Sequence, residues 1–252
     1  MKQKNEKDLL IIIPAYNEED SINELFDKIE QSRIKDIADV LIINDGSIDK
    51  TNEILRENKY PHITHVCNLG YGGALQTGYK YAIRRDYSYV IQLDADGQHD
   101  LCNIMPIYER LKQKGENGRC PDIVLGSRFV EGAISFPISF EKKIAIGFFR
   151  MLIRLFSHKK ITDPTTGLQG LSRQAVLYYS KFSNFDDHFP DANMIIQMLL
   201  LGFEVQEMPA VMHSRETGTS MHSGLKPLIY MIRMFFSIIA IWIRICVMKK
   251  VE

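Results

Sequence analysis

Cysteine is scarce in this sequence, and the few cysteines are not paired. The 252 residues include four, Cys67, Cys102, Cys120 and Cys246, with no C-x-x-C spacing and no clustering with histidine. Disulfide-dependent secreted domains and structural zinc sites both rely on closely spaced cysteines. We therefore expect neither a disulfide framework nor a zinc site, and we expect a reducing, cytoplasmic compartment.

The chain also lacks net charge, because 31 Lys and Arg balance 31 Asp and Glu. Proteins that bind nucleic acid over a broad surface carry a basic excess, so the composition argues against a nucleic-acid partner. The charge is nevertheless uneven. Residues 140–161 hold six basic residues against one acid, and residues 215–252 hold six against two.

Long apolar runs are missing as well. The residues before Leu9 are polar and the apolar run after them is short, so we expect no secretory signal. A membrane-spanning helix needs about 20 apolar residues, and the most apolar stretch, 225–247, is interrupted at Arg233 and Arg244. With no repeat and no low-complexity linker, the chain should bury one large core or two modest ones.

What is present is an alternation of short apolar strands with helical segments. Leu9–Ile13 is wholly apolar and ends at Pro14, as in a strand covered on both faces. Further strands are expected at 40–43, 62–66, 89–93 and 122–125, with helices between them, and another strand is expected at 203–208. This rhythm is typical of βαβ units, a mostly parallel sheet and an α/β fold with helices on both faces.

Polar or glycine-rich segments follow four of these strands, at 14–18, 44–49, 68–73 and 94–99. Ligands of parallel sheets bind at the carboxyl ends of the strands. The coincidence of four such segments predicts a nucleotide-like ligand across one edge of the sheet.

The fourth segment carries two carboxylates, Asp94 and Asp96, at the end of a strand. Residues i and i+2 of an extended chain point to the same side, so both can converge on one cation. Hard divalent cations take oxygen ligands and keep positions open for substrate phosphate. A lone D-x-D is more often a solvated turn, but the other strand-end segments favour a metal site here.

Two amphipathic segments, 140–160 and 225–247, combine an apolar face with basic residues. The second has one narrow polar stripe, made of Lys226, Tyr230, Arg233, Ser237 and Arg244. Because a charge near the bilayer centre is costly, we expect both helices to lie in the membrane interface, with the apolar side in lipid and the basic residues at the headgroups. Core or dimer-interface helices are the alternative.

These motifs together resemble the family 2 inverting glycosyltransferases. The resemblance rests on P-A-Y-N-E at 14–18, N-D-G-S at 44–47, N-x-G-x-x-G at 68–73, D-A-D-G-Q-H at 94–99 and G-S-R at 126–128. The subgroup that the chain most resembles is the dolichyl-phosphate mannose synthase-like enzymes, which load a sugar onto a polyprenyl phosphate. The match runs from residue 10 to about 230 and implies a Rossmann-like GT-A fold.

The resemblance implies a nucleotide-diphospho-sugar donor at the strand ends. Pro14, Tyr16 and Glu18 would line the base and ribose pocket, Asp45 would accept hydrogen bonds from the base or ribose, and Gly73 would belong to the donor loop. For Glu18 alone, a plain acid in the first turn of a helix is the alternative.

The resemblance also implies the metal ligands. Asp94, Asp96 and Gln98 would surround Mg²⁺ or Mn²⁺, which would bridge the diphosphate, with Asp94 also contacting the donor. A cation there offsets the charge that grows on the leaving nucleoside diphosphate.

Three further segments match the subgroup. Arg128 would sit near the acceptor or donor phosphate, since its planar fork suits phosphate oxygens. The D-x-(S/T)-(S/T)-G pattern that begins at Asp163 would lie near the reacting sugar. In the R-x-x-G-x-S loop, Arg215 would clamp the diphosphate and Ser220 would contact the donor.

The sequence leaves the catalytic base open between Asp163 and Asp191. A hydroxyl acceptor needs a carboxylate to take its proton, whereas a phosphate monoester is already anionic at neutral pH. Asp163 ranks slightly ahead as an active-site residue, and Asp191 is alternatively a helix-terminus acid.

We therefore expect a GT-A domain over residues 1–224 and a membrane-associated helix over 225–252. The predicted reaction is the metal-dependent, inverting transfer of a hexose, favouring a UDP-sugar such as UDP-glucose, to undecaprenyl or dolichyl phosphate at the cytoplasmic membrane face. It would serve cell-surface polysaccharide or glycan modification, and a homo-oligomer is possible. Transfer to a saccharide hydroxyl and a non-catalytic membrane-bound partner are the alternatives.

Overall fold

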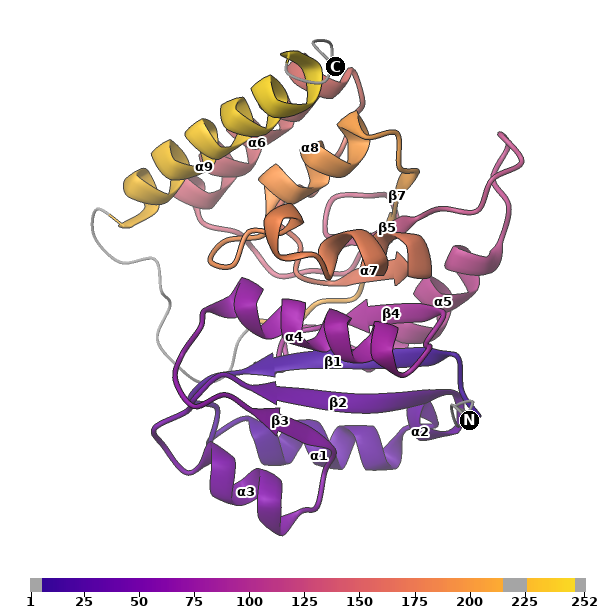
Figure 1. Cartoon of the computed structure of the whole chain (residues 1–252), viewed down its shortest axis with the longest axis vertical. Helices are drawn as coiled ribbons and strands as arrows, with labels where there is room; N and C mark the ends of the chain where they lie inside the picture. The colour runs from indigo at the N-terminus through magenta and orange to yellow at the C-terminus, as the bar shows by residue number, and fades with distance from the viewer. Residues whose placement is uncertain (1–5, 215–225, 248–252) are drawn as a thin grey trace.

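The computed structural model describes residues 6–214 and 226–247. One seven-stranded sheet runs through the molecule in the order β3-β2-β1-β4-β6-β5-β7 (Figure 1). The strands are β1 Leu9–Ala15, β2 Ala38–Asn44, β3 His62–Thr64, β4 Tyr89–Gln92, β5 Ile123–Ser127, β6 Gln169–Ser172 and β7 Val205–Pro209. The expected strands are confirmed, and β6 is an addition.

Parallel pairing dominates the sheet. Strands β3, β2, β1 and β4 pair in parallel, as do β5 and β7, while β6 is antiparallel to both β4 and β5. The register places Ala15 of β1 opposite Asn44 of β2, and Asn44 opposite Thr64 of β3. The carboxyl ends of these strands are therefore level, and the segments that follow them meet at one sheet edge.

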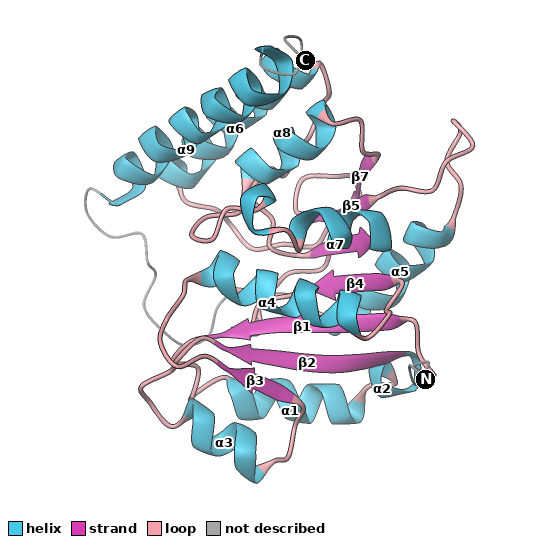
Figure 2. Cartoon of the chain, in the orientation of Figure 1, coloured by secondary structure: helices cyan, strands magenta, loops and turns pink. Residues whose placement is uncertain are grey.

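Helices cover both faces of the sheet, as Figure 2 shows. Their bounds are α1 Ile22–Gln31, α2 Ile34–Ile37, α3 Thr51–Glu57, α4 Tyr71–Arg84, α5 Ile104–Lys112, α6 Phe140–Ser157, α7 Arg173–Tyr179, α8 Ala192–Leu200 and α9 Lys226–Trp242. Short 3₁₀ turns occupy Leu101–Asn103 and Phe182–Asn184, and a π-helical turn, Ile243–Val247, extends α9.

Two hydrophobic cores explain this arrangement. Side chains of β1 alternate: Leu9 and Ile11 join a core with α1 and α5, while Leu10 and Ile12 join a core with α4 and α7. Because both faces of β1 are buried, its sequence is uniformly apolar rather than alternating. The second core continues into α6, α8 and α9.

The helices α6, α8 and α9 form a layer beyond the sheet (Figure 1). Aromatic rings join α6 to α9, with Phe148 and Phe235 centred 6.1 Å apart and Phe156 and Trp242 5.6 Å apart. Both predicted amphipathic helices are present. The predicted boundary at 224/225 falls outside the described residues and stays a prediction.

Polar side chains of the α9 stripe contact the protein, while Arg233 and Arg244 are also exposed, so the predicted contact of the stripe with headgroups stays a prediction. Ser237 Oγ accepts from Asn193 Nδ2 at 3.0 Å, Arg244 Nη2 donates to Gln197 Oε1 at 2.6 Å, and the Arg233 guanidinium lies 5.2 Å from the Phe189 ring centre. Residues 229–247 are long and apolar enough to cross a membrane by length and composition alone. The hydrogen bonds of Ser237 and Arg244 tie the helix to α8.

Candidate active site

The first two strand-end segments are joined by hydrogen bonds. The backbone N–H of Asn17 donates to Ser47 Oγ at 3.0 Å, Asn17 Oδ1 accepts from the Ile48 N–H at 3.0 Å, and the Glu18 N–H donates to Thr51 Oγ1 at 2.9 Å. Pro14 is buried within β1, while the Tyr16 side chain beside it is exposed. This leaves Tyr16 and the partly exposed Glu18 at the rim, where the donor pocket was predicted.

Asp45 is buried and organises the third strand-end segment. Its Oδ1 accepts from the Leu69 N–H and its Oδ2 from the Gly70 N–H, both at 2.9 Å, and Oδ1 also lies 2.7 Å from His65 Nδ1. The observed task of this carboxylate is to hold the glycine loop. The predicted contact between Asp45 and the donor stays a prediction. A donor group would have to bind oxygens that already accept from the Leu69 and Gly70 N–H groups.

The glycines at the start of α4 permit a close backbone approach. The Gly73 N–H donates to the Asp187 carbonyl at 2.9 Å, and a Cβ on Gly72 would lie only 2.1 Å from the Asp186 carbonyl oxygen. The 186–187 backbone therefore covers this helix start, so Gly73 shapes the site without presenting its own N–H to a phosphate.

The two carboxylates of the D-x-D segment follow β4 and are partly exposed. Asp94 Oδ1 accepts from Tyr71 OH at 2.8 Å, and burial raises the pKa of Tyr71, so this hydroxyl stays protonated and donates. Asp96 Oδ1 accepts from the Gln98 N–H at 3.1 Å, which makes a tight turn of 96–98. His99 Nδ1 accepts from the Asp94 N–H at 3.1 Å and fixes the strand end.

This pair suits a divalent cation that shares its ligands with a substrate. No cluster of three or more His, Cys, Asp or Glu side chains suited to a metal occurs among the described residues. Magnesium is usually held by one or two carboxylates together with substrate phosphates and water. Asp94 and Asp96 fit that pattern, while the predicted ligation by the Gln98 side chain stays a prediction.

Arg128 and Asp163 form a buried, bidentate ion pair. Arg128 Nε and Nη2 each donate to Asp163 at 2.7 Å, the Arg128 N–H donates at 3.0 Å, and Nη2 also reaches Thr165 Oγ1 at 2.9 Å. Asp163 is fully buried. Its carboxylate is committed to holding Arg128, so this geometry does not support Asp163 as a base.

A second carboxylate supports this pair from β7. Glu207 accepts from the Thr162 N–H at 2.7 Å and from the Asp163 N–H and Thr162 Oγ1, each at 2.8 Å. Arg128 Nη1, by contrast, has no hydrogen-bond partner within residues 6–214 and 226–247. The ion pair therefore holds the two N–H groups of Arg128 Nη1 in a fixed orientation, in which they can bind an anion. The sequence did not reveal the support from Glu207, because Glu207 belongs to no motif.

Asp191, just before α8, lies among the other site residues. Tyr230 OH of α9 donates to Asp191 Oδ2 at 2.6 Å. The pKa of Asp191 is raised to about 6, chiefly by burial and also by the charges of Asp94 and Asp186, while the Tyr230 hydrogen bond and Arg128 lower it. Asp94 and Arg128 are therefore close enough to Asp191 to influence its charge, which places the three residues at one site.

Comparison with known proteins places this site in a family. The family model for "Glycosyl transferase family 2" matches residues 10–177, which is most of the chain and spans the strand-end segments, Arg128 and Asp163. The chain belongs to this family. The transferase is therefore an enzyme of the predicted class, and its predicted family is confirmed.

The relatives of the transferase cover most of its length. It is 29% identical over 234 residues to an undecaprenyl-phosphate mannosyltransferase of Micrococcus luteus, covering 86% of this chain and 88% of the relative. It is 27% identical over 227 residues to a polyprenol monophosphomannose synthase of Mycolicibacterium smegmatis, covering 85% and 81%.

A solved structure confirms the fold. Glucosyl-3-phosphoglycerate synthase from Mycobacterium tuberculosis, in complex with Mn²⁺, UDP and phosphoglyceric acid, superposes with a TM-score of 0.66 at 15% identity over 96% of this chain and 79% of the other. The expected GT-A fold of the transferase is thereby confirmed.

Not every predicted site residue can be placed. Arg215 and Ser220 lie outside the described residues, and their predicted roles stay predictions. Besides Glu207, two site residues were not predicted from the sequence. Tyr71 had no predicted role, and Tyr230 was placed in a polar stripe with no link to Asp191.

Proposed function

We propose that the transferase moves a hexose from a nucleotide-diphospho-sugar to a polyprenyl phosphate, with inversion at the anomeric carbon. The observation that carries this proposal is the contact between Tyr230 of α9 and Asp191. It joins the reaction site directly to a helix whose outer face is apolar and exposed, and an acceptor with a lipid chain needs such an entry. The names of both relatives, which include a polyprenol or its phosphate, support this acceptor class.

The donor would lie across the level strand ends. Asp94 and Asp96 would hold Mg²⁺ or Mn²⁺ against the diphosphate, and the bound cation would offset charge on the leaving group. Tyr71 keeps the Asp94 carboxylate oriented, and the loop held by Asp45 closes one side of the site.

The acceptor would approach the anomeric carbon from the opposite side. One phosphate oxygen forms the new bond to that carbon as its bond to the diphosphate breaks, so an α-linked donor gives a β-linked product. The free Nη1 of Arg128 is suited to hold the acceptor phosphate, because Asp163 fixes the plane of its guanidinium. No proton has to be removed from an acceptor that is already anionic.

The environment of Asp191 supports one alternative function, in which the acceptor is a sugar hydroxyl. A carboxylate with a pKa of about 6 near the reaction site is suited to remove a proton at neutral pH. The two acceptors therefore make different demands on this residue.

Replacing Asp191 with asparagine separates these acceptors. For a phosphate acceptor we expect transfer to fall by no more than about tenfold. A hydroxyl acceptor that uses Asp191 as base would lose about 10²-fold or more. Steady-state rates for both acceptors, measured on the same protein preparation, give the answer.

The same variant should also be more stable near pH 7. The pKa of Asp191 is raised in the folded protein from its ordinary 3.8 to about 6, so the unfolded chain ionises more easily and folding stability falls as pH rises through that window. Asparagine removes this cost and should raise the free energy of unfolding by about 1 to 2 kcal/mol. This range is smaller than the full pKa shift would give, because the side chain is partly exposed to solvent. Denaturant unfolding at about pH 5 and pH 7 measures it; a helix-terminus acid would instead make the variant less stable.

For the donor we propose a UDP-hexose. A UDP-sugar is favoured, while both relatives are named for mannose. Released nucleotide, measured across UDP- and GDP-sugars with a short polyprenyl phosphate and with Mg²⁺, Mn²⁺ or a chelator, identifies the donor and the metal. Release that is equally fast with the chelator would contradict the metal requirement.

We also propose that the exposed faces of α6 and α9 rest on the cytoplasmic side of the membrane. On α9 the exposed side chains recur at helical spacing, as Ile229, Ile232, Phe236, Ile243 and Val247. On α6 they are Phe140, Ile144, Met151 and Leu155. Exposed apolar surface of this extent indicates an interaction site.

Acidic substitutions on α9 test the membrane face. Ile232→Glu with Phe236→Glu should move the protein from the membrane fraction to the soluble fraction, because each change places a charge in the apolar contact region. Leu177→Glu, which alters an exposed apolar residue of α7, is the control and should leave the distribution unchanged. Equal distributions for all three proteins would contradict this placement.

A further inference from the structure

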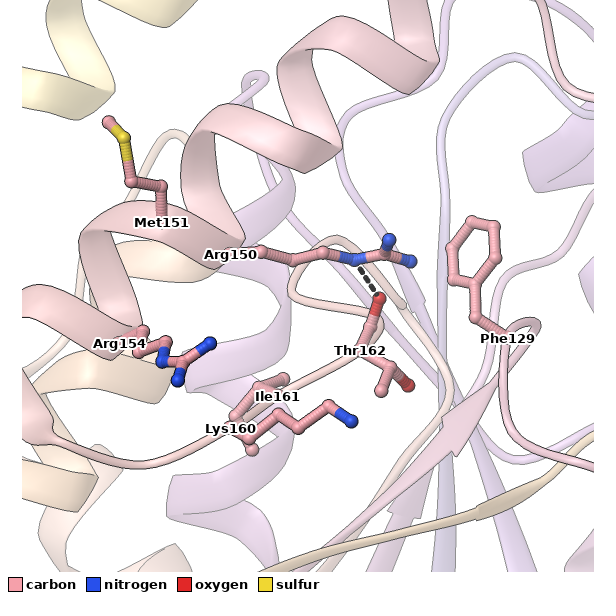
Figure 3. A pocket seen from close by; sticks show the side chains of 7 residues that line it. All are labelled: Phe129, Arg150, Met151, Arg154, Lys160, Ile161 and Thr162. Carbon is pink, nitrogen blue, oxygen red and sulfur yellow. Dashed lines mark hydrogen bonds between the residues drawn. The ribbon is translucent and has the colours of Figure 1, made fainter.

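A pocket of about 500 Å³ lies between α6 and the segment at 160–162, apart from the predicted donor and metal residues. Figure 3 shows Arg150, Arg154 and Lys160 around it, with Phe129 and Thr162 on the far wall. None of its lining residues belongs to the predicted donor, acceptor or metal set. Its lining is thus distinct from the predicted donor-binding residues, while Phe129 and Thr162 adjoin Arg128 and Asp163 in the sequence.

The charge of this pocket is uncompensated. Arg150, Arg154 and Lys160 form no salt bridge with any described residue. Glu207, a carboxylate beyond Thr162, already accepts from the N–H groups of Thr162 and Asp163. Three cations around one cavity with no carboxylate in its lining favour an anionic ligand.

Arg150 is already positioned for such a ligand. Its Nε donates to the Thr162 carbonyl at 2.6 Å, and its guanidinium lies 4.4 Å from the Phe129 ring centre. These two contacts fix the plane of the group (Figure 3). Its Nη2 atom is buried and has no hydrogen-bond partner among the residues that the structure describes. A buried donor without a partner is costly, and an anion in this pocket would satisfy it.

The surroundings of the pocket point to a lipid. Met151 lines it and is also part of the exposed apolar row of α6, with Ile144 seven residues before it and Leu155 four residues after it. A phosphate bound by Arg150 would thus have its hydrocarbon chains beside this row. Basic residues that border an apolar helix face commonly meet lipid headgroups.

We propose that this pocket binds the phosphate ester of a membrane lipid. The planar forks of Arg150 and Arg154 suit phosphate oxygens, and Lys160 adds a mobile third charge. The site would hold α6 at a fixed depth and orientation on the membrane. Binding at this site does not depend on sugar transfer, so either proposal can fail without the other.

Vesicle sedimentation of the full chain, without donor, tests the proposal. The vesicles contain phosphatidylcholine alone, with phosphatidylglycerol added, or with a short polyprenyl phosphate added. The pocket variant is Arg154→Gln with Lys160→Gln. The charge-matched control is Lys143→Gln with Lys159→Gln, two exposed lysines on and after α6 that do not line the pocket.

We expect the pocket variant to lose at least about tenfold more affinity for lipid-phosphate vesicles than the control. Each variant loses two basic residues and with them the same general attraction to an anionic surface. The difference in affinity between the two variants therefore measures the contribution of the pocket. A difference with phosphatidylglycerol identifies a membrane phospholipid and supports the proposal, whereas a difference only with polyprenyl phosphate would make the pocket part of the acceptor site and would overturn a separate lipid site. Equal losses for both variants would overturn the proposal.

Arg150→Lys and inorganic phosphate complete the test. Lysine keeps the charge but loses the buried fork, so this variant should bind the same vesicles several-fold more weakly than wild type. Inorganic phosphate should compete with the vesicles only weakly. The opposite outcome is that inorganic phosphate stabilises the wild type but not the pocket variant, while the pocket and control variants bind vesicles equally. In that case the site binds free phosphate, and the lipid proposal is wrong.

Discussion

Replacing Asp96 with alanine is expected to reduce sugar transfer by about 10²- to 10³-fold, because one of two carboxylates for the cation is removed. Asp94 would remain with its Tyr71 hydrogen bond at 2.8 Å, so the fold should be retained. Product formation is measured over a range of Mn²⁺ concentrations. The loss should be partly recovered at high Mn²⁺, since a weakened site still fills by mass action.

The control for this prediction is Asp20→Ala, which removes an exposed carboxylate outside the strand-end pair. It should transfer sugar like the wild type. If Asp96→Ala were as active as this control, the metal assignment would be wrong. If no transfer is found even in the wild type, a non-catalytic partner with the same fold becomes the better account.

Breaking the Arg128–Asp163 pair should have the largest effect on stability. Asp163→Asn leaves the Arg128 guanidinium, whose side chain is 13% exposed, without its counter-charge. Removing one member of a buried ion pair costs about 3 to 5 kcal/mol. Denaturant unfolding measures the loss, and transfer should fall with it because Arg128 is no longer held in place.

The double variant Arg128→Gln with Asp163→Asn separates structure from catalysis. A neutral hydrogen-bonding pair avoids the buried charge, so most of the lost stability should return. Transfer should nevertheless stay about 10²-fold below wild type, because a charged fork for phosphate is missing. Recovery of both stability and activity would show that Arg128 is only structural.

Sequence patterns predicted the strands because buried parallel strands are distinctive. Leu9–Ile13 is apolar at every position, since both faces of β1 are covered. In contrast, β6 escaped prediction because its four residues, Gln169–Ser172, show neither an apolar run nor a clear alternation. Its Gly170 allows close packing instead, since a Cβ there would lie 2.3 Å from Ile107.

The site was only partly predictable for a similar reason. The D-x-D pair and Arg128 belong to local motifs, so the sequence shows them directly. The partners that fix their roles are distant in the chain: Asp163 lies 35 residues from Arg128, and Tyr230 lies 39 from Asp191. Only the fold brings them together, and it moves Asp163 from candidate base to the residue that positions Arg128.

Helix α9 shows where periodicity alone is insufficient. Its polar stripe is visible in the sequence, but the remaining surface is apolar on several sides, so the pattern does not say which side meets the protein. Asn193 and Gln197 of α8, both buried, provide the hydrogen-bond partners for Ser237 and Arg244. Hydrogen bonds with these two residues orient Ser237 and Arg244 toward α8.

The acceptor assay tests the central proposal most directly. Purified wild-type protein is given a labelled nucleotide sugar, the divalent cation, and either a short polyprenyl phosphate or an oligosaccharide. We predict a labelled polyprenyl monophosphate sugar with a β linkage, and no labelled oligosaccharide. Labelled oligosaccharide without any labelled lipid would contradict the account.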